Sequence, residues 1–173
     1  DEFSISVAFI TKSGITPLLQ TLKELENRNI PGRILTTDYL GFSEPEAMNK
    51  LAELKNIDLK MYRTRDTEDG FHTKGYIFKK DGFYKGIIGS SNMTMNALTV
   101  NKEWNVEFTS LNEGEMLSQI RREFESLWNQ AEDLESVLPI YEKIYKDTKR
   151  FTNIREISRD LKEKNITLTP NYM

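Results

Sequence analysis

The chain has 173 residues, of which 38% are hydrophobic, and it contains no cysteine. This length suits one domain with a substantial core and is too short to argue for two. Without cysteine the chain can form neither disulfides nor a thiolate zinc site, and such a composition favours a cytoplasmic location. We find no signal peptide and no apolar run near the ~20 residues that a membrane helix needs, so no membrane partner is expected.

The net charge is −3, which argues against binding nucleic acid through bulk electrostatics. Any phosphate site must therefore be local. Residues 60–85 form a basic window with seven basic and four acidic side chains. A charged run is usually a solvated face, but this window is the first place to look for phosphate contacts.

The first half of the chain alternates strand-like and helix-like segments. Residues 4–10 begin with alternating polarity and end fully apolar, as a strand entering the middle of a sheet does. The next segments are predicted, in chain order, as a helix at 18–28, a strand at 33–37, a helix at 45–54 and a strand at 57–62. Strands separated by single helices predict a parallel or mixed sheet, hence an α/β domain.

The second half of the chain begins with a predicted hairpin. Two β-rich runs, 74–80 and 83–90, flank Asp81-Gly82, a dipeptide that favours a tight turn. The remaining predicted elements are a short helix at 92–98, a strand at 103–110 and a helical stretch from 113 to about 150, interrupted near Pro139.

These elements together predict a single α/β domain over residues 1–150. We expect a mixed, mostly parallel β-sheet with helices on both faces. Residues 151–173 are charged and poor in aromatic residues, and we predict that they form a C-terminal helical extension or linker.

His72 is the only histidine of the chain, and Lys74 lies two residues after it. On the predicted strand, the side-chain period of two places both residues on one face, so that a base and a cation share a surface. Alone, this pair is a weak signal, because a lone histidine is more often a surface or core residue than a catalyst.

A second group of polar residues, Gly89-Ser90-Ser91-Asn92, follows the second strand of the hairpin. Its glycine allows close backbone approach, and Ser90 and Asn92 offer neutral hydrogen-bond donors. Alone, this run is ordinary turn chemistry. Strand pairing would bring it beside the histidine and the lysine, and the acidic Glu103 follows soon after. The conjunction predicts a pocket of phosphate size.

These motifs resemble the signature of the phospholipase D superfamily, which is H-x-K, then G-S-x-N after a gap, and often N-x-E. In this chain they are His72-Thr73-Lys74, Gly89-Ser90-Ser91-Asn92 and Asn101-Lys102-Glu103. The longer form of the first motif has an aspartate where this chain has Lys79. The classical phospholipid enzymes are therefore the poorer match, and the nuclease-like members the better one.

Three longer stretches, 33–51, 71–78 and 89–108, resemble a narrower group. This group is the phospholipase-D-like nuclease domain that is fused to DEAD/DEAH-box helicases in bacteria. The resemblance spans most of residues 4–109. It implies an α/β/α sandwich fold, DNA or another nucleic acid as substrate, and a covalently linked helicase module in a longer protein.

The resemblance also implies a mechanism in two steps. One histidine attacks phosphorus and forms a phosphohistidine, while a second histidine protonates the leaving oxygen and then activates water. By this resemblance His72 is the nucleophile, and Lys74 and Asn92 hold the non-bridging oxygens. Ser90 adds a hydrogen bond, and Glu103 bonds the other imidazole nitrogen. No metal and no cofactor is required.

This mechanism needs two histidines, whereas the chain has one. The simplest source of the second histidine is another copy of the chain, related by a two-fold axis near the site. We therefore predict a homodimer whose active site is shared across the interface.

Further residues are weaker candidates. Arg63 and Arg65 could track a nucleic-acid backbone, although loop arginines are more often solvated, and Ser91 is a candidate substrate contact within its motif. Trp104 could stack on a base, but an aromatic residue on a predicted strand is more often part of the core. Asp38 and Tyr39 follow a predicted strand, where open α/β sheets place ligand-facing loops.

Three functions remain open. The first is a metal-independent phosphodiesterase, acting as a DNA endonuclease beside a helicase module. The second is a lipid phosphodiesterase or phosphatidyltransferase, which an exposed apolar rim or a membrane helix would favour, and the sequence shows neither. The third is a non-catalytic module for nucleic-acid binding or dimerisation that retains the pocket, although the complete set of His72, Lys74 and Asn92 argues against lost catalysis.

Overall fold

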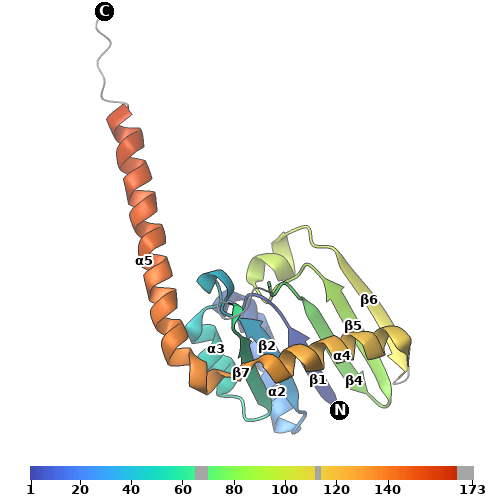
Figure 1. The fold of residues 1–173 in the computed structure, drawn as a ribbon. Helices are drawn as coiled ribbons and strands as arrows, with labels where there is room; N and C mark the ends of the chain where they lie inside the picture. Colours follow the sequence, from blue (N-terminus) through green and yellow to red (C-terminus); the bar gives the residue numbers. More distant parts are fainter. Residues whose placement is uncertain (65–69, 112–113, 167–173) are drawn as a thin grey trace, which may run out of the picture.

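The computed structural model describes residues 1–64, 70–111 and 114–166. Seven strands of this part form one mixed sheet in the order β6-β5-β4-β1-β2-β3-β7 (Figure 1). The strands are β1 (Glu2–Ser6), β2 (Gly32–Thr37), β3 (Ile57–Tyr62), β4 (Gly75–Lys80), β5 (Phe83–Gly89), β6 (Asn105–Leu111) and β7 (Glu132–Asp133).

Helical segments connect and cover these strands. They are α1 (Lys12–Ile15), the 3₁₀ turn η1 (Thr16–Leu18), α2 (Leu19–Asn27), the 3₁₀ turn η2 (Tyr39–Gly41), α3 (Pro45–Ala52), the π-helical turn η4 (Asn96–Val100), α4 (Glu115–Gln130) and α5 (Leu134–Ile166). The predicted α/β class and the predicted mixed sheet are confirmed.

The expectation of mostly parallel pairing is corrected. Among the described strands, β1–β2 and β2–β3 pair in parallel, whereas β1–β4, β4–β5, β5–β6 and β3–β7 are antiparallel. A parallel pair needs a crossover connection, usually a helix, and such helices connect only the first three strands. β4, β5 and β6 follow one another through a turn and a loop, which favour antiparallel neighbours, and β7 joins the opposite edge of the sheet after α4.

The helices cover both faces of the sheet, as predicted. On one face, residues of β1, β2 and β3 pack with α2, α3 and the start of α5 in a core that includes Ile5, Ile34, Met48 and Tyr141. On the other face, α4 lies across the sheet (Figure 1), and its Phe124 packs in a cluster with Leu35. β1, β2 and β3 therefore bury residues on both sides, which explains the apolar runs in the first half of the sequence.

The predicted hairpin forms between β4 and β5. Asp81 and Gly82 have φ of +50° and +80°, which is the conformation of the two-residue turns that Asp-Gly favours. This turn lies at one end of the two strands. The other end carries Lys74 and Gly89, whose backbones are joined by a hydrogen bond of 3.1 Å from the amide of Gly89.

The predicted break near Pro139 is wrong. The chain breaks instead at Ala131–Asp133, where β7 pairs with β3, and α5 then continues through Pro139. Pro139 lies just beyond the first helical turn, so only one backbone hydrogen bond is lost. The predicted domain boundary at residue 150 lies inside α5, which projects away from the sheet (Figure 1); the boundary stays a prediction. No helix in the described part of the chain is long and apolar enough to cross a membrane.

Candidate active site

His72 and Lys74 lie in a segment without regular secondary structure, directly before β4. The expectation that both belong to the strand is corrected. Gly75 is the first residue of β4 and pairs with Ser6, the last residue of β1. Before Gly75 the segment therefore has no partner in β1, and β5 reaches it only through the hydrogen bond from Gly89 to Lys74. It sits at the carboxyl ends of the parallel strands, where α/β sheets commonly bind ligands.

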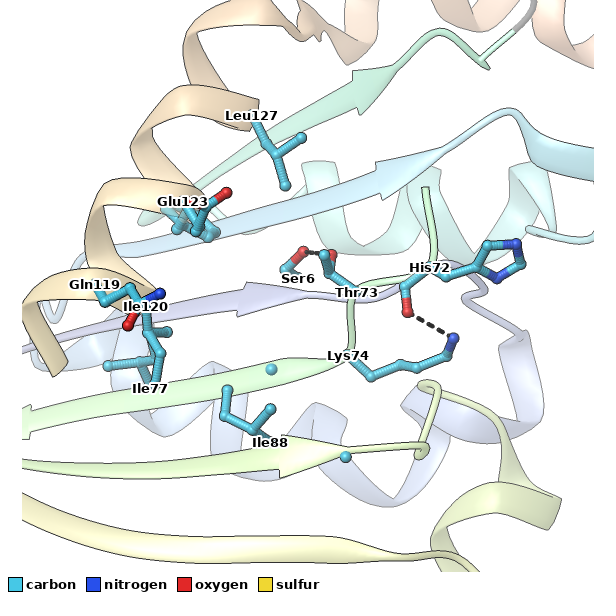
Figure 2. Close-up of a pocket in the computed structure, with 13 residues that line it drawn as sticks. Ser6, His72, Thr73, Lys74, Ile77, Ile88, Gln119, Ile120, Glu123 and Leu127 are labelled. Carbon is cyan, nitrogen blue, oxygen red and sulfur yellow. Dashed lines mark hydrogen bonds between the residues drawn. The ribbon is translucent and has the colours of Figure 1, made fainter. Parts of the chain in front are cut away.

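A cavity of about 420 Å³ opens between this segment and α4. Figure 2 shows His72 and Lys74 at one end of it, while Gln119, Glu123 and Leu127 approach from α4. The rest of the lining is mainly apolar and includes Ile77, Ile88, Ile120 and Phe124. The site thus combines a base and a cation with a neighbouring apolar recess.

The His72–Lys74 pair is held together through the backbone. The Lys74 ammonium donates a hydrogen bond of 2.7 Å to the carbonyl oxygen of His72 (Figure 2). The His72 side chain is exposed, and its ring meets the ring of Tyr39 edge to face at 5.0 Å between centroids. The intervening Thr73 hydroxyl shares a hydrogen bond of 2.5 Å with the Ser6 hydroxyl, which fixes the segment against β1.

Partial burial lowers the pKa of Lys74 below its ordinary value, and the nearby carboxylate of Glu103 opposes this effect. Desolvation penalises the ammonium form, whereas a neighbouring negative charge favours it. Burial, and secondarily the same carboxylate, raise the pKa of the Tyr76 hydroxyl, which donates to the carbonyl oxygen of Ser91 at 3.1 Å. Lys74 and Glu103 therefore share one electrostatic environment.

The Gly89–Asn92 loop folds against the residues before β6. The amide of Ser90 donates to the carbonyl oxygen of Trp104 at 3.0 Å, and the amide of Trp104 donates to the Ser90 hydroxyl at 3.1 Å. A Cβ at Gly89 would lie 2.1 Å from the Trp104 carbonyl oxygen, so only glycine fits there. These contacts bring the second and third sequence motifs together.

Glu103 is held inside this loop arrangement. Its carboxylate accepts a hydrogen bond from the Ser90 hydroxyl and another from the side-chain amide of Asn101 at 3.2 Å. Within the part of the chain that the structure describes, it makes no hydrogen bond to His72. The predicted contact with the imidazole is thus not formed within one chain, and in its place the carboxylate orients Ser90.

Asn92 is fixed by the first strand segment. Its side-chain oxygen accepts a hydrogen bond of 3.1 Å from the amide of Phe9. This contact leaves the amide NH₂ group as the part of the side chain that can donate to a ligand. The backbone of the next residue, Met93, is tied to Phe9 by a further hydrogen bond of 3.1 Å, so the position of Asn92 is well determined.

Ser91 does not face the same cavity. It is 6% exposed, and its hydroxyl accepts a hydrogen bond of 2.8 Å from the side-chain amide of Asn105. Ser91 lines a separate apolar groove beside α2, together with Leu98 and Phe78. The adjacent serines thus point to different sides of the loop, and the geometry gives Ser91 a structural partner in place of the predicted substrate contact.

Arg63 is engaged by acidic residues. Its Nε lies 3.2 Å from a carboxylate oxygen of Asp38, and its Nη1 lies 3.6 Å from Glu132. Asp38 is 1% exposed and also accepts hydrogen bonds from Thr64. Arg63 therefore neutralises a buried carboxylate, which argues against its predicted role on a nucleic-acid backbone, and Arg65 lies outside the described residues.

The structure contradicts the expected burial of Trp104 and shows a contact of Tyr39 that the sequence did not specify. Trp104 is 90% exposed, so the preference for a core position is wrong. It precedes β6 at the open edge of the sheet, where no helix covers it. Tyr39 contacts His72, although only its place after a predicted strand suggested proximity to a ligand. No sequence signal indicated the Ser6–Thr73 contact.

Comparison with known proteins identifies the family. A family model described as "Cardiolipin synthase, PLD-like domain" matches residues 1–128. The chain belongs to the phospholipase-D-like family. No curated protein sequence matches this phospholipase-D-like chain. The family assignment, together with His72 and Lys74 at one cavity, supports an enzyme that acts, in the broad sense, on phosphodiesters.

Two solved structures are similar to the chain at low sequence identity. The phosphatidylserine synthase of Haemophilus influenzae Rd KW20 is similar with a TM-score of 0.56 and 15% identity, over 90% of this chain and 40% of that one. The phospholipase-D-like chain thus spans less than half of that synthase. TrmBL2, an archaeal chromatin protein described as showing a novel mode of DNA binding, has a TM-score of 0.46 and 15% identity, over 76% of this chain and 44% of that one.

Proposed function

We propose that this phospholipase-D-like domain hydrolyses phosphodiester bonds of DNA without a metal ion, through a phosphohistidine on His72. The observation that carries the proposal is the position of His72 and Lys74 at the mouth of one cavity, with Glu103 in the electrostatic environment of the lysine. A nucleophile beside a cation is the arrangement that attack on an anionic phosphodiester requires.

In the first step, an imidazole nitrogen of His72 bonds to phosphorus while the bond from phosphorus to the leaving oxygen breaks. The leaving oxygen takes a proton from a second, protonated histidine. In the second step this histidine takes a proton from water, the water oxygen bonds to phosphorus, and the bond between phosphorus and His72 breaks. Both histidines are then restored.

Lys74 and Asn92 stabilise the charge that develops on the non-bridging oxygens. The Lys74 ammonium carries three donors and uses one on the carbonyl oxygen of His72, so it can turn to a phosphate without losing its anchor. The Asn92 oxygen is occupied by Phe9, which directs the NH₂ group to a ligand. Such preorganised donors are the main source of catalysis in phosphoryl transfer.

The second histidine comes from a second copy of the chain in this proposal. Exposed apolar side chains close to Glu103 in sequence support a contact between two copies. Val100, Trp104 and Val106 are exposed by 73%, 90% and 66%. Large exposed apolar side chains that cluster within seven residues are typical of an interface. They flank Glu103, so a second copy seated on them would approach the site.

A lipid phosphodiester is the second candidate substrate. The apolar part of the 420 Å³ cavity, which includes Ile77, Ile88 and Leu127, could accept a hydrocarbon chain beside the phosphate position. DNA is preferred because the sequence motifs resemble those of the helicase-fused nucleases. The helicase module and the cytoplasmic location stay predictions.

The proposal is tested by incubating the domain with plasmid DNA, single-stranded DNA and phospholipid vesicles in excess chelator, beside His72→Ala. We expect the wild type to cleave DNA and the variant to leave it intact. Equal cleavage by both proteins would contradict the proposal. Turnover of phospholipid without cleavage of DNA would establish the second candidate.

A further inference from the structure

Among the described residues, Tyr39 is the aromatic neighbour of the His72 ring. The ring centroids are 5.0 Å apart and the ring planes cross at 73°, an edge-to-face geometry that aromatic pairs favour. Within the described part of the chain, the imidazole makes no hydrogen bond. The ring of Tyr39 is therefore the group placed to set the orientation of the imidazole in a single chain.

The carboxylate expected to orient His72 is used elsewhere. Glu103 accepts hydrogen bonds from Ser90 and Asn101. A catalytic histidine commonly relies on a neighbouring group to fix its tautomer and ring position. In this chain a ring contact occupies that place.

Hydrogen bonds hold the backbone around Tyr39, so that its ring can orient the imidazole of His72. The preceding residue, Asp38, is 1% exposed and accepts hydrogen bonds from Nε of Arg63 at 3.2 Å and from the amide and hydroxyl of Thr64, both at 2.8 Å. The amide of Tyr39 donates to the hydroxyl of Thr37 at 3.2 Å. The loop after β2 is thus tied to the end of β3, and the segment after β3 leads to His72.

The loop also contains a strained residue next to Tyr39. Leu40 has φ of +55°, a left-handed conformation that leucine rarely adopts. Its side chain is half exposed, so burial of leucine does not explain the conformation. Strain of this kind persists where surrounding contacts enforce it and is concentrated at functional sites.

We propose that Tyr39 is a positioning residue for His72. Its ring packs against the imidazole and restricts it to the orientation from which a ring nitrogen attacks phosphorus. This inference rests on the proposed function for its catalytic consequence, and the ring contact itself can be tested without any substrate.

The test uses three variants and the single histidine of the chain. Tyr39→Leu removes the ring, and Tyr39→Phe keeps it. Phe42→Leu is the matched control, because Phe42 lies in the same loop as Tyr39 but pairs edge to face with Phe9, which follows β1. We expect Tyr39→Leu to lower kcat by about 2- to 10-fold, the range that one aromatic pair can supply, with KM unchanged. Tyr39→Phe and Phe42→Leu should retain the wild-type kcat.

Proton NMR supplies the second readout, because one histidine gives one set of imidazole signals. We expect cross-relaxation between the rings of His72 and Tyr39 in the wild type, and a shift of the imidazole signals in Tyr39→Leu but not in Phe42→Leu. Absence of cross-relaxation in the wild type would overturn the proposal, even if Tyr39→Leu failed to fold.

Two kinetic outcomes would also overturn it. One is a folded Tyr39→Leu variant with wild-type kcat. The other is an equal loss in Tyr39→Phe, since the hydroxyl and not the ring would then be the acting group. A wild type without activity on any phosphodiester would instead contradict the proposed function, and the NMR experiment would still decide whether the ring contact exists.

Discussion

The hydroxyl of Ser90 donates a hydrogen bond to the carboxylate of Glu103. This contact joins the loop after β5 to the segment before β6, and the same hydroxyl accepts from the amide of Trp104 at 3.1 Å. Ser90 is thereby fixed between two motifs, whereas the neighbouring Ser91 is buried against Asn105. The two serines can be separated experimentally.

Ser90→Ala should lower activity by about 10-fold, because Glu103, whose carboxylate acts on the charge of Lys74, loses one of its two hydrogen-bond donors. Ser91→Ala is the matched control. It leaves the Asn105 amide without its acceptor and should cost about 1–2 kcal/mol of unfolding free energy, with normal activity per folded molecule. Urea unfolding and DNA cleavage rates separate the two effects. Equal loss of activity in both variants would contradict the assignment of Ser90 to the site and of Ser91 to stability alone.

The buried Asp38 should be a strong determinant of stability. Asp38→Asn removes the charge of a buried carboxylate that accepts hydrogen bonds from Arg63 and Thr64, and we expect a loss of about 2–3 kcal/mol of unfolding free energy. Glu132→Gln removes the more distant partner, whose side chain is 51% exposed, and should cost less than about 1 kcal/mol. Urea midpoints measure both. Similar losses of unfolding free energy in the two variants would contradict the larger role of Asp38 in stability.

Lys74 should limit activity at alkaline pH. Burial lowers the pKa of its ammonium, so the charge that stabilises the phosphate oxygens is lost at a lower pH than an exposed lysine would lose it. The alkaline limb of the pH profile of kcat/KM should therefore begin below the ordinary lysine range. Lys74→Arg should move this limb upward, because the guanidinium stays charged. If the alkaline limb stays at the same pH in Lys74→Arg, deprotonation of Lys74 is not its cause.

The exposed Trp104 should belong to the contact between two copies. Trp104→Glu should shift the sedimentation equilibrium from dimer to monomer and reduce activity in parallel. Leu111→Glu is the matched control, because Leu111 is also exposed, by 62%, at the other end of the same strand. A monomeric wild type, or equal dissociation in both variants, would contradict this placement of the interface.

Much of the fold could be predicted from local patterns. Asp81-Gly82 specifies its own turn, and apolar runs specify strands buried on both faces. The direction of pairing could not be predicted, because it depends on which strands share a crossover helix. The segment before Gly75 is predicted as a strand because its residue types are common in strands. It forms none because β1 ends at Ser6, a constraint that lies in another part of the chain.

The residues of the candidate site were predictable, but many of their contacts were not. His72, Lys74 and Asn92 were selected through motif spacing, which resembles the signature of the family. The partners of Glu103 and the exposure of Trp104 depend on how two loops meet in space. No periodicity in the sequence encodes such contacts, which also explains why the Tyr39–His72 contact was not foreseen.

The central claim is that each active site uses the histidines of two chains. It is tested by mixing wild type with His72→Ala at constant total protein, allowing subunits to exchange, and measuring DNA cleavage in excess chelator. If both histidines are needed, activity should follow the square of the wild-type fraction, so an equal mixture should retain about one quarter of full activity. Retention of about one half, the value expected if each chain acts alone, would contradict the claim.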